Sequence, residues 1–412
     1  MTDISPLAPS SFPVLPPVAG VRLATHEAGI RYAKRADLFL AELAEGTTVA
    51  GTFTKSLCPS APVDWCRRIL GAGDGSARAI VCNSGNANAF TGKAGDTAAA
   101  LTADLVGQAL GVDPDTIYLA STGVIGETLP SDALRAGLPA LAAKLEASGA
   151  DGWAASAGAI RTTDTFSKAA SAAVPDTSAH IVGIAKGSGM IAPDMATMLA
   201  FVFTDLAVAP DVLQRVLSAS VAASFNRITV DSDTSTSDTV LLFATGAQPD
   251  AIISSTADPR VPGFQAALDG VLLDLAHQIV RDGEGATKFV EVQVTGAASA
   301  DAAEIIAFAI GNSPLVKTAL AAEDANWGRI VMAVGKAGQA ADRDELEIWI
   351  GPELVAAKGV QVDGYSEARA TEHLRGDEIT IRVDVGVGDG AAAIWTCDLT
   401  HGYIDINAGY RS

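Results

Sequence analysis

One segment of this sequence places a hydroxyl group where it could act as a nucleophile. It runs from Lys186 through a glycine-rich turn and Pro193-Asp194 into a strand-like stretch whose first residue is Thr197. A threonine hydroxyl is a weak nucleophile at neutral pH and needs an adjacent base. If the chain were cut before Thr197, the new α-amine could be that base, because its unperturbed pKa is roughly 8. The alternative is an ordinary loop that enters a strand at a β-branched residue.

Other catalytic and metal-binding patterns are incomplete in this chain. The five histidines are scattered, neither GxSxG nor HExxH occurs, and the four cysteines form no CxxC pair. The stretch 231–239, DSDTSTSDT, begins like a calcium-binding loop, but Thr236 and Leu242 replace the glycine and the bidentate glutamate that such a loop requires. We interpret it as a loop with many side-chain-to-backbone hydrogen bonds. We therefore expect no metal ion and no histidine-based triad.

The glycine-rich stretch 386–391, GVGDGA, matches a loose dinucleotide-binding pattern. That pattern binds pyrophosphate where a helix begins at it, because the first amides of the helix then face the phosphates. A second strand-like run follows here instead. We therefore predict a β-hairpin turn at 386–391 and no bound cofactor.

Composition and charge exclude several classes of protein. The chain has 412 residues, of which 49% are hydrophobic and 18% charged, and its formal net charge is -20. Nucleic acids and anionic lipids attract clustered Lys and Arg, whereas the excess here is acidic. Residues 1–196 hold 14 basic and 18 acidic side chains, and residues 197–412 hold 14 and 30. We expect no nucleic acid or membrane as a partner, and a chain long enough for a large core.

The N-terminus and the cysteines indicate a soluble cytoplasmic protein. The first 20 residues are rich in proline and contain no Lys or Arg, which fits neither a signal peptide nor an Arg-rich transit peptide. No uncharged apolar run reaches the ~18 residues of a membrane helix. The cysteine spacing does not fit a disulfide-rich scaffold, so a reducing compartment is the simplest assignment.

Hydrophobic spacing predicts the elements that must position these residues. Helical spacing predicts helices over 98–110, 131–145, 213–221 and 264–281. Ser131 is placed to cap the second of these, and Pro139 should kink or split it. Several strands follow one another near the C-terminus, which favours α+β layers over a regular βαβ alternation. The predicted strands are 78–82, 180–186, 198–204, 239–245, 288–296, 345–351, 378–386 and 392–400.

Eight sequence blocks together resemble the glutamate N-acetyltransferase family, whose members are also called ornithine acetyltransferases. The matches run in the family's order from about residue 20 to the last residue, and the set is more specific than any one block. They are VCNSGNANA (81–89), ASTGVIGE (120–127), RTTDT (161–165), GSGMIAPDMATMLAF (187–201), FNRITVDSDTSTSDT (225–239), EGATK (284–288), NWGRI (326–330) and WTCDLTHGYIDINAGYRS (395–412).

The resemblance implies an α+β fold of layered mixed sheets and helices, shared with DmpA-like aminopeptidases, and processing of the N-terminal-nucleophile type. The precursor would cut itself between Ala196 and Thr197, giving an α chain of residues 1–196 and a β chain of residues 197–412 that form an α2β2 heterotetramer. Thr197 would take the acetyl group of N-acetylornithine as an ester and pass it to glutamate, without a cofactor. The family places this reaction in arginine biosynthesis.

The resemblance also implies the residues of the site. Thr122 and Gly123 match the oxyanion-hole pair, whose hydroxyl and backbone N–H would stabilise the tetrahedral intermediate. Lys186 suits a substrate carboxylate, and Glu284 suits the ornithine ammonium. Two further positions lie at the C-terminus, where chains usually fray, so their role requires a docked tail. The implied substrate-binding set is Thr163, Lys186, Thr197, Glu284, Asn407 and Ser412.

Three alternatives stay open at this point. Amidohydrolases and aminopeptidases of the related fold use the same type of nucleophile, and water would then resolve the acyl-enzyme. The resemblance also leaves open whether acetyl-CoA is a second acetyl donor, which would add N-acetylglutamate synthase activity. A binding protein that only keeps the fold would form no acetyl adduct at Thr197.

Overall fold

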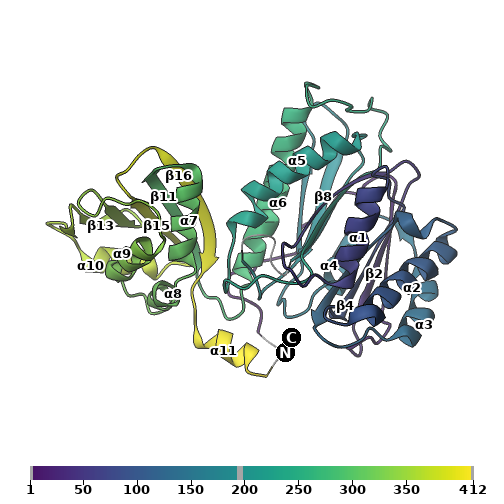
Figure 1. Cartoon of the computed structure of the whole chain (residues 1–412), viewed down its shortest axis with the longest axis horizontal. Coiled ribbons are helices and arrows are strands. Elements are labelled where there is room, and N and C mark those ends of the chain that lie inside the picture. The colour runs from purple at the N-terminus through teal and green to yellow at the C-terminus, as the bar shows by residue number, and fades with distance from the viewer. Residues whose placement is uncertain (1–2, 193–197, 410–412) are drawn as a thin grey trace. The chain divides into compact units, whose positions relative to one another are not determined.

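The computed structural model describes residues 3–192 and 198–409. These residues form two compact units, each assembled from separate stretches of chain (Figure 1). Within the described ranges, the larger unit contains residues 9–226 and 233–279, and the smaller unit contains 3–8, 227–232 and 280–409. The predicted cut at 196/197 therefore falls inside the larger unit. The two predicted chains do not correspond to the two units.

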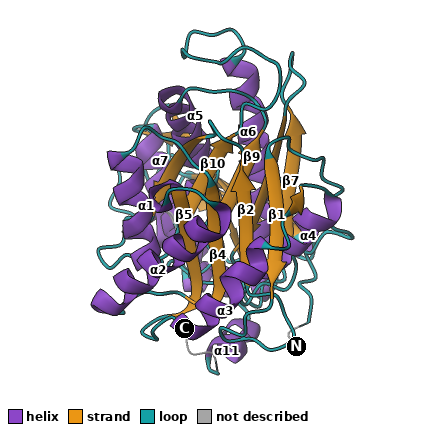
Figure 2. Cartoon of the chain, turned by 90° about the vertical axis from the view of Figure 1, so that its right-hand side faces the viewer, coloured by secondary structure: helices purple, strands orange, loops and turns teal. Residues whose placement is uncertain are grey.

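Two five-stranded sheets form the centre of the larger unit. Their strands are β1 (Val21–His26), β2 (Leu38–Leu43), β3 (Thr48–Phe53), β4 (Ala79–Asn86), β5 (Ile117–Val124), β6 (Glu146–Ala147), β7 (Lys168–Ala173), β8 (His180–Lys186), β9 (Leu199–Thr204) and β10 (Thr239–Ala244). The first sheet has the order β5-β4-β2-β1-β6, and the second has the order β3-β10-β9-β8-β7. Figure 2 looks onto the first sheet, with β5, β4, β2 and β1 labelled.

Six helices of the described residues pack around the two sheets. They are α1 (Ala61–Ala72), α2 (Gly92–Leu110), α3 (Ser131–Ala142), α4 (Ala150–Ala159), α5 (Pro210–Ala223) and α6 (Val261–Arg281). Figure 1 shows α2 and α3 outside the first sheet, and α5 and α6 outside the second. At Gly183 in β8, an added Cβ would lie 2.8 Å from the Leu275 side chain of α6. The absence of a side chain there allows the helix to pack closely on the sheet.

Aromatic side chains join the two sheets face to face. Phe39 of β2 stacks on Phe201 of β9, with ring centroids 5.8 Å apart. Phe203, also in β9, lies 5.4 Å from Phe243 of β10 and 5.3 Å from Trp153 of α4. All six residues of β9 are buried, because the strand lies between the first sheet on one side and helices on the other. This double burial explains why β9 reads as a continuous apolar run.

The second sheet interleaves the two predicted chains. β3, β7 and β8 precede residue 196, whereas β9 and β10 follow it. β8 pairs antiparallel with β9, and Lys186 lies opposite Leu199 in that pairing. β10 pairs parallel with β9 and antiparallel with β3, where Thr239 lies opposite Phe53. The two strands of the predicted β chain thus lie between strands of the predicted α chain.

One six-stranded sheet with helices forms the smaller unit. Its strands are β11 (Phe289–Ala297), β12 (Glu347–Ile350), β13 (Glu353–Ala357), β14 (Val360–Gln361), β15 (Glu378–Asp384) and β16 (Gly390–Cys397). Its helices are α7 (Ala300–Gly311), α8 (Pro314–Ala321), α9 (Trp327–Lys336), α10 (Glu367–Leu374) and α11 (His401–Asn407). The strand order is β14-β13-β12-β15-β11-β16. Val290, Val292 and Val294 of β11 are buried on the side that faces the core of this unit.

The α+β architecture predicted from the sequence is confirmed, and each predicted helix and strand has a counterpart at its position. Two details of the helix predicted from Ser131 are wrong. Pro130 is the N-cap, so Ser131 is the first helical residue and makes no capping hydrogen bond. The predicted split is the second, because the helix continues through Pro139 to Ala142. None of the described helices has the length and apolarity of a membrane span.

The β-hairpin predicted at 386–391 is also wrong. β15 and β16 do not pair with each other, because β11 lies between them. β15 runs parallel to β11, and β16 runs antiparallel to it. The glycine-rich turn reverses the chain, but it leads to the far side of a strand that comes much earlier in the sequence.

The aromatic contacts predict which side chains stabilise the larger unit. Replacing Phe203 with Ala should lower the free energy of unfolding by about 3–5 kcal/mol, because a fully buried ring would be removed from a close-packed core. Thermal and denaturant unfolding followed by circular dichroism would measure this. Phe90→Ala is the matched control, because Phe90 is 84% exposed. An equal decrease in the free energy of unfolding in the two variants would contradict the assignment of Phe203 to the core.

Candidate active site

Thr122 and Gly123 lie near the end of β5, which runs parallel to β4. Gly123 has a φ of +131°, and an added Cβ would lie 2.3 Å from the carbonyl carbon of Gly85, so only glycine fits. The pairing register between the two strands shifts beside this position, between Gly85 and Asn86. Such irregularities commonly re-aim side chains next to active sites.

Lys186, which belongs to the second sheet, contacts Thr122 of the first sheet. It is the last residue of β8 and is only 2% exposed, and its Nζ donates a hydrogen bond to Thr122 Oγ1 at 3.2 Å. Because an ammonium group can only donate, the hydroxyl oxygen accepts here and directs its own hydrogen elsewhere. The Thr122 hydroxyl therefore keeps a hydrogen that it can donate to another group.

Thr163 lies beside the turn that follows β8. Its Oγ1 is 2.7 Å from the Oγ of Ser188. The next residue, Asp164, accepts a hydrogen bond from the backbone N–H of Gly187 at 2.7 Å through Oδ1. These contacts tie the loop that carries Thr163 to the end of the strand that carries Lys186. The structure thus brings together the predicted site residues of the larger unit, which are Thr122, Gly123, Thr163 and Lys186.

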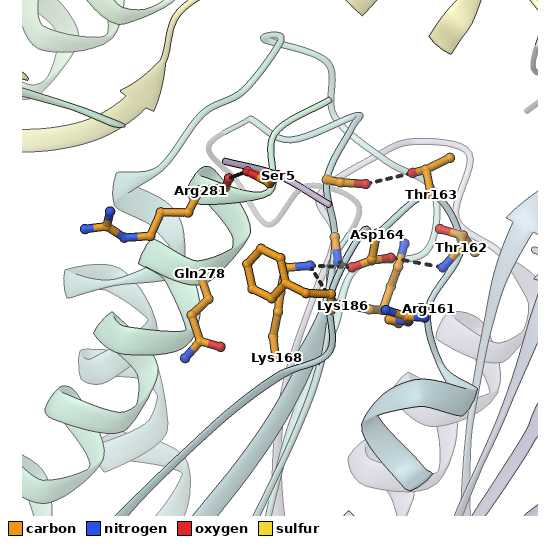
Figure 3. Close-up of polar contacts among 12 residues, drawn as sticks. Ser5, Arg161, Thr162, Thr163, Asp164, Lys168, Lys186, Gln278 and Arg281 are labelled. Atoms are coloured by element: carbon orange, nitrogen blue, oxygen red, sulfur yellow. Dashed lines mark hydrogen bonds and ion pairs between the residues drawn. The ribbon is translucent and has the colours of Figure 1, made fainter. Parts of the chain in front are cut away.

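A buried ion pair supports this cluster (Figure 3). Lys168 Nζ lies 2.7 Å from Asp164 Oδ1, and both side chains are fully buried. The same ammonium lies 4.7 Å from the centroid of the Phe166 ring. Burial alone would raise the pKa of the Asp164 carboxyl, but the ammonium groups of Lys168 and Lys186 hold it well below its ordinary value. One ionised carboxylate thus compensates two buried lysines.

Sequence reasoning did not identify Asp164 and Lys168 as parts of the site. Asp164 lies inside the block RTTDT, so the resemblance contained a signal for it. Lys168 lies outside every such block, at the start of β7, and only its burial marks it.

The predicted cleavage site Ala196-Thr197 and the predicted substrate residue Ser412 lie outside the described residues. The described chain resumes at Met198, whose backbone N–H donates a hydrogen bond to Asp238 Oδ1 at 3.0 Å. Asp238 lies in the stretch 231–239, where side chains bond the backbone as predicted. For example, Ser235 Oγ accepts a hydrogen bond from the N–H of Ser237 at 3.0 Å.

Glu284 and Asn407 belong to the smaller unit and contact each other. Asn407 Nδ2 donates a hydrogen bond to Glu284 Oε2 at 2.7 Å. Asn407 is the last residue of α11, and the Thr400 hydroxyl caps this helix while donating to the Gly285 carbonyl at 2.6 Å. An added Cβ at Gly285 would lie 2.4 Å from the Tyr403 nitrogen, so the two segments pack backbone to backbone. The docked tail required for a role of Asn407 is therefore present.

No group of three or more His, Cys, Asp and Glu side chains within 3–192 and 198–409 could hold a metal ion. The cysteines are all free thiols, and Cys58 alone of the four is exposed. Burial raises the pKa of Cys66 to about 12 and also raises the pKa of Cys82 and Cys397. The buried thiols are therefore un-ionised at neutral pH and unreactive as nucleophiles.

Comparison with known proteins identifies close relatives over nearly the whole chain. The model of the ArgJ family matches residues 22–412. The arginine biosynthesis bifunctional protein ArgJ of Gluconobacter oxydans (strain 621H) is 55% identical over 411 residues, which cover 99% of this chain and 96% of that protein. The crystal structure of the same-named protein from Bacillus halodurans is 43% identical, with a TM-score of 0.48, and covers 50% of this chain and 96% of its own. An ornithine acetyltransferase from Mycobacterium tuberculosis, solved with ornithine, is 33% identical, with a TM-score of 0.37, and covers 43% of this chain and 92% of its own.

The Asp164–Lys168 pair predicts how stability depends on pH. The pKa of Asp164 is lower in the folded than in the unfolded protein, where it is about 4, so its stabilisation is present above that pH and is lost as the pH falls further. Asp164→Asn leaves Lys168 buried without its carboxylate and should lower the free energy of unfolding by about 3–5 kcal/mol at neutral pH. Its stability should also change less with acid than that of the wild type.

Denaturant unfolding between pH 3 and pH 7 would test this. Asp258→Asn is the control, because Asp258 likewise pairs with a cationic side chain, that of Arg260. This second pair is partly exposed, with side-chain exposures of 18% for Asp258 and 22% for Arg260. A loss as large for Asp258→Asn as for Asp164→Asn would show that burial of the Asp164 pair is not what matters.

Proposed function

The chain belongs to the ArgJ family, and we propose that it transfers the acetyl group of N2-acetylornithine to glutamate, giving ornithine and N-acetylglutamate in arginine biosynthesis. Relatives carry the name arginine biosynthesis bifunctional protein ArgJ, and one related structure is named as an ornithine acetyltransferase bound to ornithine. The observation in this chain that carries the proposal is the contact between Lys186 and Thr122. It places the proposed carboxylate-binding lysine beside the proposed oxyanion donor.

Self-cleavage would prepare the nucleophile. The Thr197 hydroxyl oxygen attacks the carbonyl carbon of Ala196, the peptide nitrogen takes up a proton and leaves as the α-amine of Thr197, and water hydrolyses the resulting ester. The products are an α chain that ends at Ala196 and a β chain that begins at Thr197. The new α-amine then lies on the same residue as the hydroxyl that it must activate.

Acetyl transfer would follow in two steps of the ping-pong type. The α-amine takes the hydroxyl proton of Thr197 as its oxygen attacks the acetyl carbonyl carbon, and ornithine leaves with its amine protonated. The glutamate amine then attacks the acetyl-threonine ester, and the hydroxyl regains its proton. In both steps the Thr122 hydroxyl and the Gly123 N–H would donate to the oxyanion. The hydrogen bond from Lys186 supports this role, because it leaves the Thr122 hydrogen available.

The remaining residues would bind the two substrates. We assign Lys186 and Thr163 to the carboxylate of the substrate. We assign Glu284, with Asn407, to the ammonium of ornithine, and Glu284 would accept a charge-assisted hydrogen bond from it. Ser412 and Thr197 complete the proposed set. We also propose that the cleaved chains assemble as an α2β2 heterotetramer in the cytoplasm.

A second activity is favoured by the word bifunctional in the name of the relatives. Acetyl-CoA would then acetylate Thr197 in place of acetylornithine, and glutamate would accept the acetyl group as before. This adds N-acetylglutamate synthesis without a second nucleophile.

The cleavage proposal predicts the chain composition of the protein. Wild-type protein denatured after purification should give two chains that meet at Thr197, whereas Thr197→Ala should give one chain of 41.8 kDa and no acetyl transfer. Thr197→Ser is the conservative control and should still cleave, because it keeps a hydroxyl nucleophile. Intact-mass analysis would measure both. A wild type that is uncleaved and fully active would overturn the mechanism.

The transfer proposal predicts how products depend on the acceptor. With acetylornithine, glutamate should accelerate ornithine release and yield an equal amount of N-acetylglutamate, because the acyl-enzyme waits for an amine. Acetate release that glutamate does not affect would instead indicate an amidohydrolase or aminopeptidase. Incubation with acetyl-CoA and glutamate should also yield N-acetylglutamate if the chain is bifunctional. A protein with only a binding role would form no acetyl adduct at Thr197.

A further inference from the structure

Asp238 is a buried carboxyl group that none of the assigned roles uses. It directly precedes β10, and its side chain is 0% exposed. Its Oδ1 accepts the Met198 N–H at 3.0 Å. No described group donates a hydrogen bond to its Oδ2. The Thr54 hydroxyl lies beside the carboxyl but gives its hydrogen to the Ser235 carbonyl, at 2.6 Å.

Such an arrangement is unfavourable for stability alone. A buried polar atom without a partner costs free energy, and native structures retain few of them. Burial raises the pKa of Asp238 well above its ordinary value, although the Met198 amide and the Lys186 ammonium act in the opposite direction. Whatever its charge, the carboxyl interacts with Met198 as a hydrogen-bond acceptor.

The backbone around Asp238 is held firmly in the second sheet. Its carbonyl accepts the Thr54 N–H at 3.0 Å, next to β3. The following residue, Thr239, donates its N–H to the Met198 carbonyl at 3.1 Å. Met198 thus has both its N–H and its carbonyl bonded to the pair Asp238-Thr239. Because Met198 precedes the first residue of β9, the Asp238 side chain supplies an acceptor where the strand ladder has ended.

We propose that Asp238 is a positioning residue for Thr197, which it holds through the backbone N–H of Met198. This inference rests on the proposed function. After cleavage Thr197 would be a chain terminus, and its one covalent link to the protein would be the peptide bond to Met198. Termini fray unless they are tied down. The N–H of that peptide bond is the atom that Asp238 holds.

A small displacement of a nucleophile has a large effect on rate. A misplacement of about 1 Å can lower a rate on the order of 100-fold. The hydrogen bond from Met198 to Asp238 should therefore affect kcat and the rate of self-cleavage. It should leave KM nearly unchanged, because the proposed substrate contacts other than Thr197 are made by residues that Asp238 does not hold.

Two substitutions distinguish the role of the hydrogen-bond acceptor at position 238 from the role of the carboxyl group itself. Asp238→Leu fills similar space without an acceptor and should slow both self-cleavage and acetyl transfer on the order of 100-fold, with KM changed by less than about threefold. Asp238→Asn keeps an oxygen acceptor and should remain within a few-fold of the wild type in both rates. Time courses of cleavage on denaturing gels and steady-state kinetics with acetylornithine and glutamate would measure these effects.

Asp205→Leu is the control at the opposite end of β9, because Asp205 directly follows that strand. Asp205 is also buried and accepts a backbone N–H, from His180 at 2.9 Å. Its substitution should lower the melting temperature but leave the rate of cleavage unchanged. Normal rates in Asp238→Leu would overturn the inference alone, whereas a wild type that neither cleaves nor transfers would overturn the proposed function. If Asp238→Leu does not fold, Asp238→Asn decides: rates far below the wild type contradict a positioning role.

Discussion

The candidate site depends on the burial of two lysine ammonium groups around the Asp164 carboxylate. Lys168 and Lys186 both lie in the interior of the larger unit, where an unpaired ammonium would cost several kcal/mol. Asp164 compensates both, and it also accepts the N–H of Gly187. Three segments must therefore converge on one point. They are the loop before β7, the end of β8 and the turn after β8. Lys186 donates its hydrogen bond to Thr122 at that point.

Rigid layers make this convergence possible. Two sheets pack through aromatic rings such as Phe39 and Phe201, and helices pack around them. The residues that meet at the site are far apart in sequence, but each lies at or near the end of a strand in this sandwich. Hydrogen bonds to neighbouring strands fix the backbone at a strand end. The side chains there can still contact side chains from the other sheet. The smaller unit holds a separate contact, in which α11 and its N-cap Thr400 pack on the loop that carries Glu284.

Features that depend on neighbouring residues could be predicted from the sequence, whereas features that depend on distant contacts could not. Strands β8 to β10 were predicted because burial on both faces leaves uninterrupted apolar runs, and the long amphipathic α6 was predicted from its spacing. The hairpin at 386–391 was not predictable, because a turn pattern says that the chain reverses and not which strand becomes its neighbour. The proposed roles of Thr122 and Lys186 came from resemblance, and their contact was not visible in the sequence. Lys168 could not be recognised, because a lysine is ordinarily exposed and only the folded protein shows its partner.

The interleaved second sheet imposes an order on the events that make the proposed enzyme. β9 and β10 lie between β8 on one side and β3 on the other. A polypeptide of residues 1–196 made alone would lack the two middle strands, and its partner would present the same strands with both edges unpaired, a common route to aggregation. Assembly of the sheet would therefore precede the proposed cut, because the uncut chain keeps the two halves together while their strands pair. After the cut, the hydrogen bonds between paired strands would keep the two chains together. Exchange of chains between molecules would require those hydrogen bonds to break.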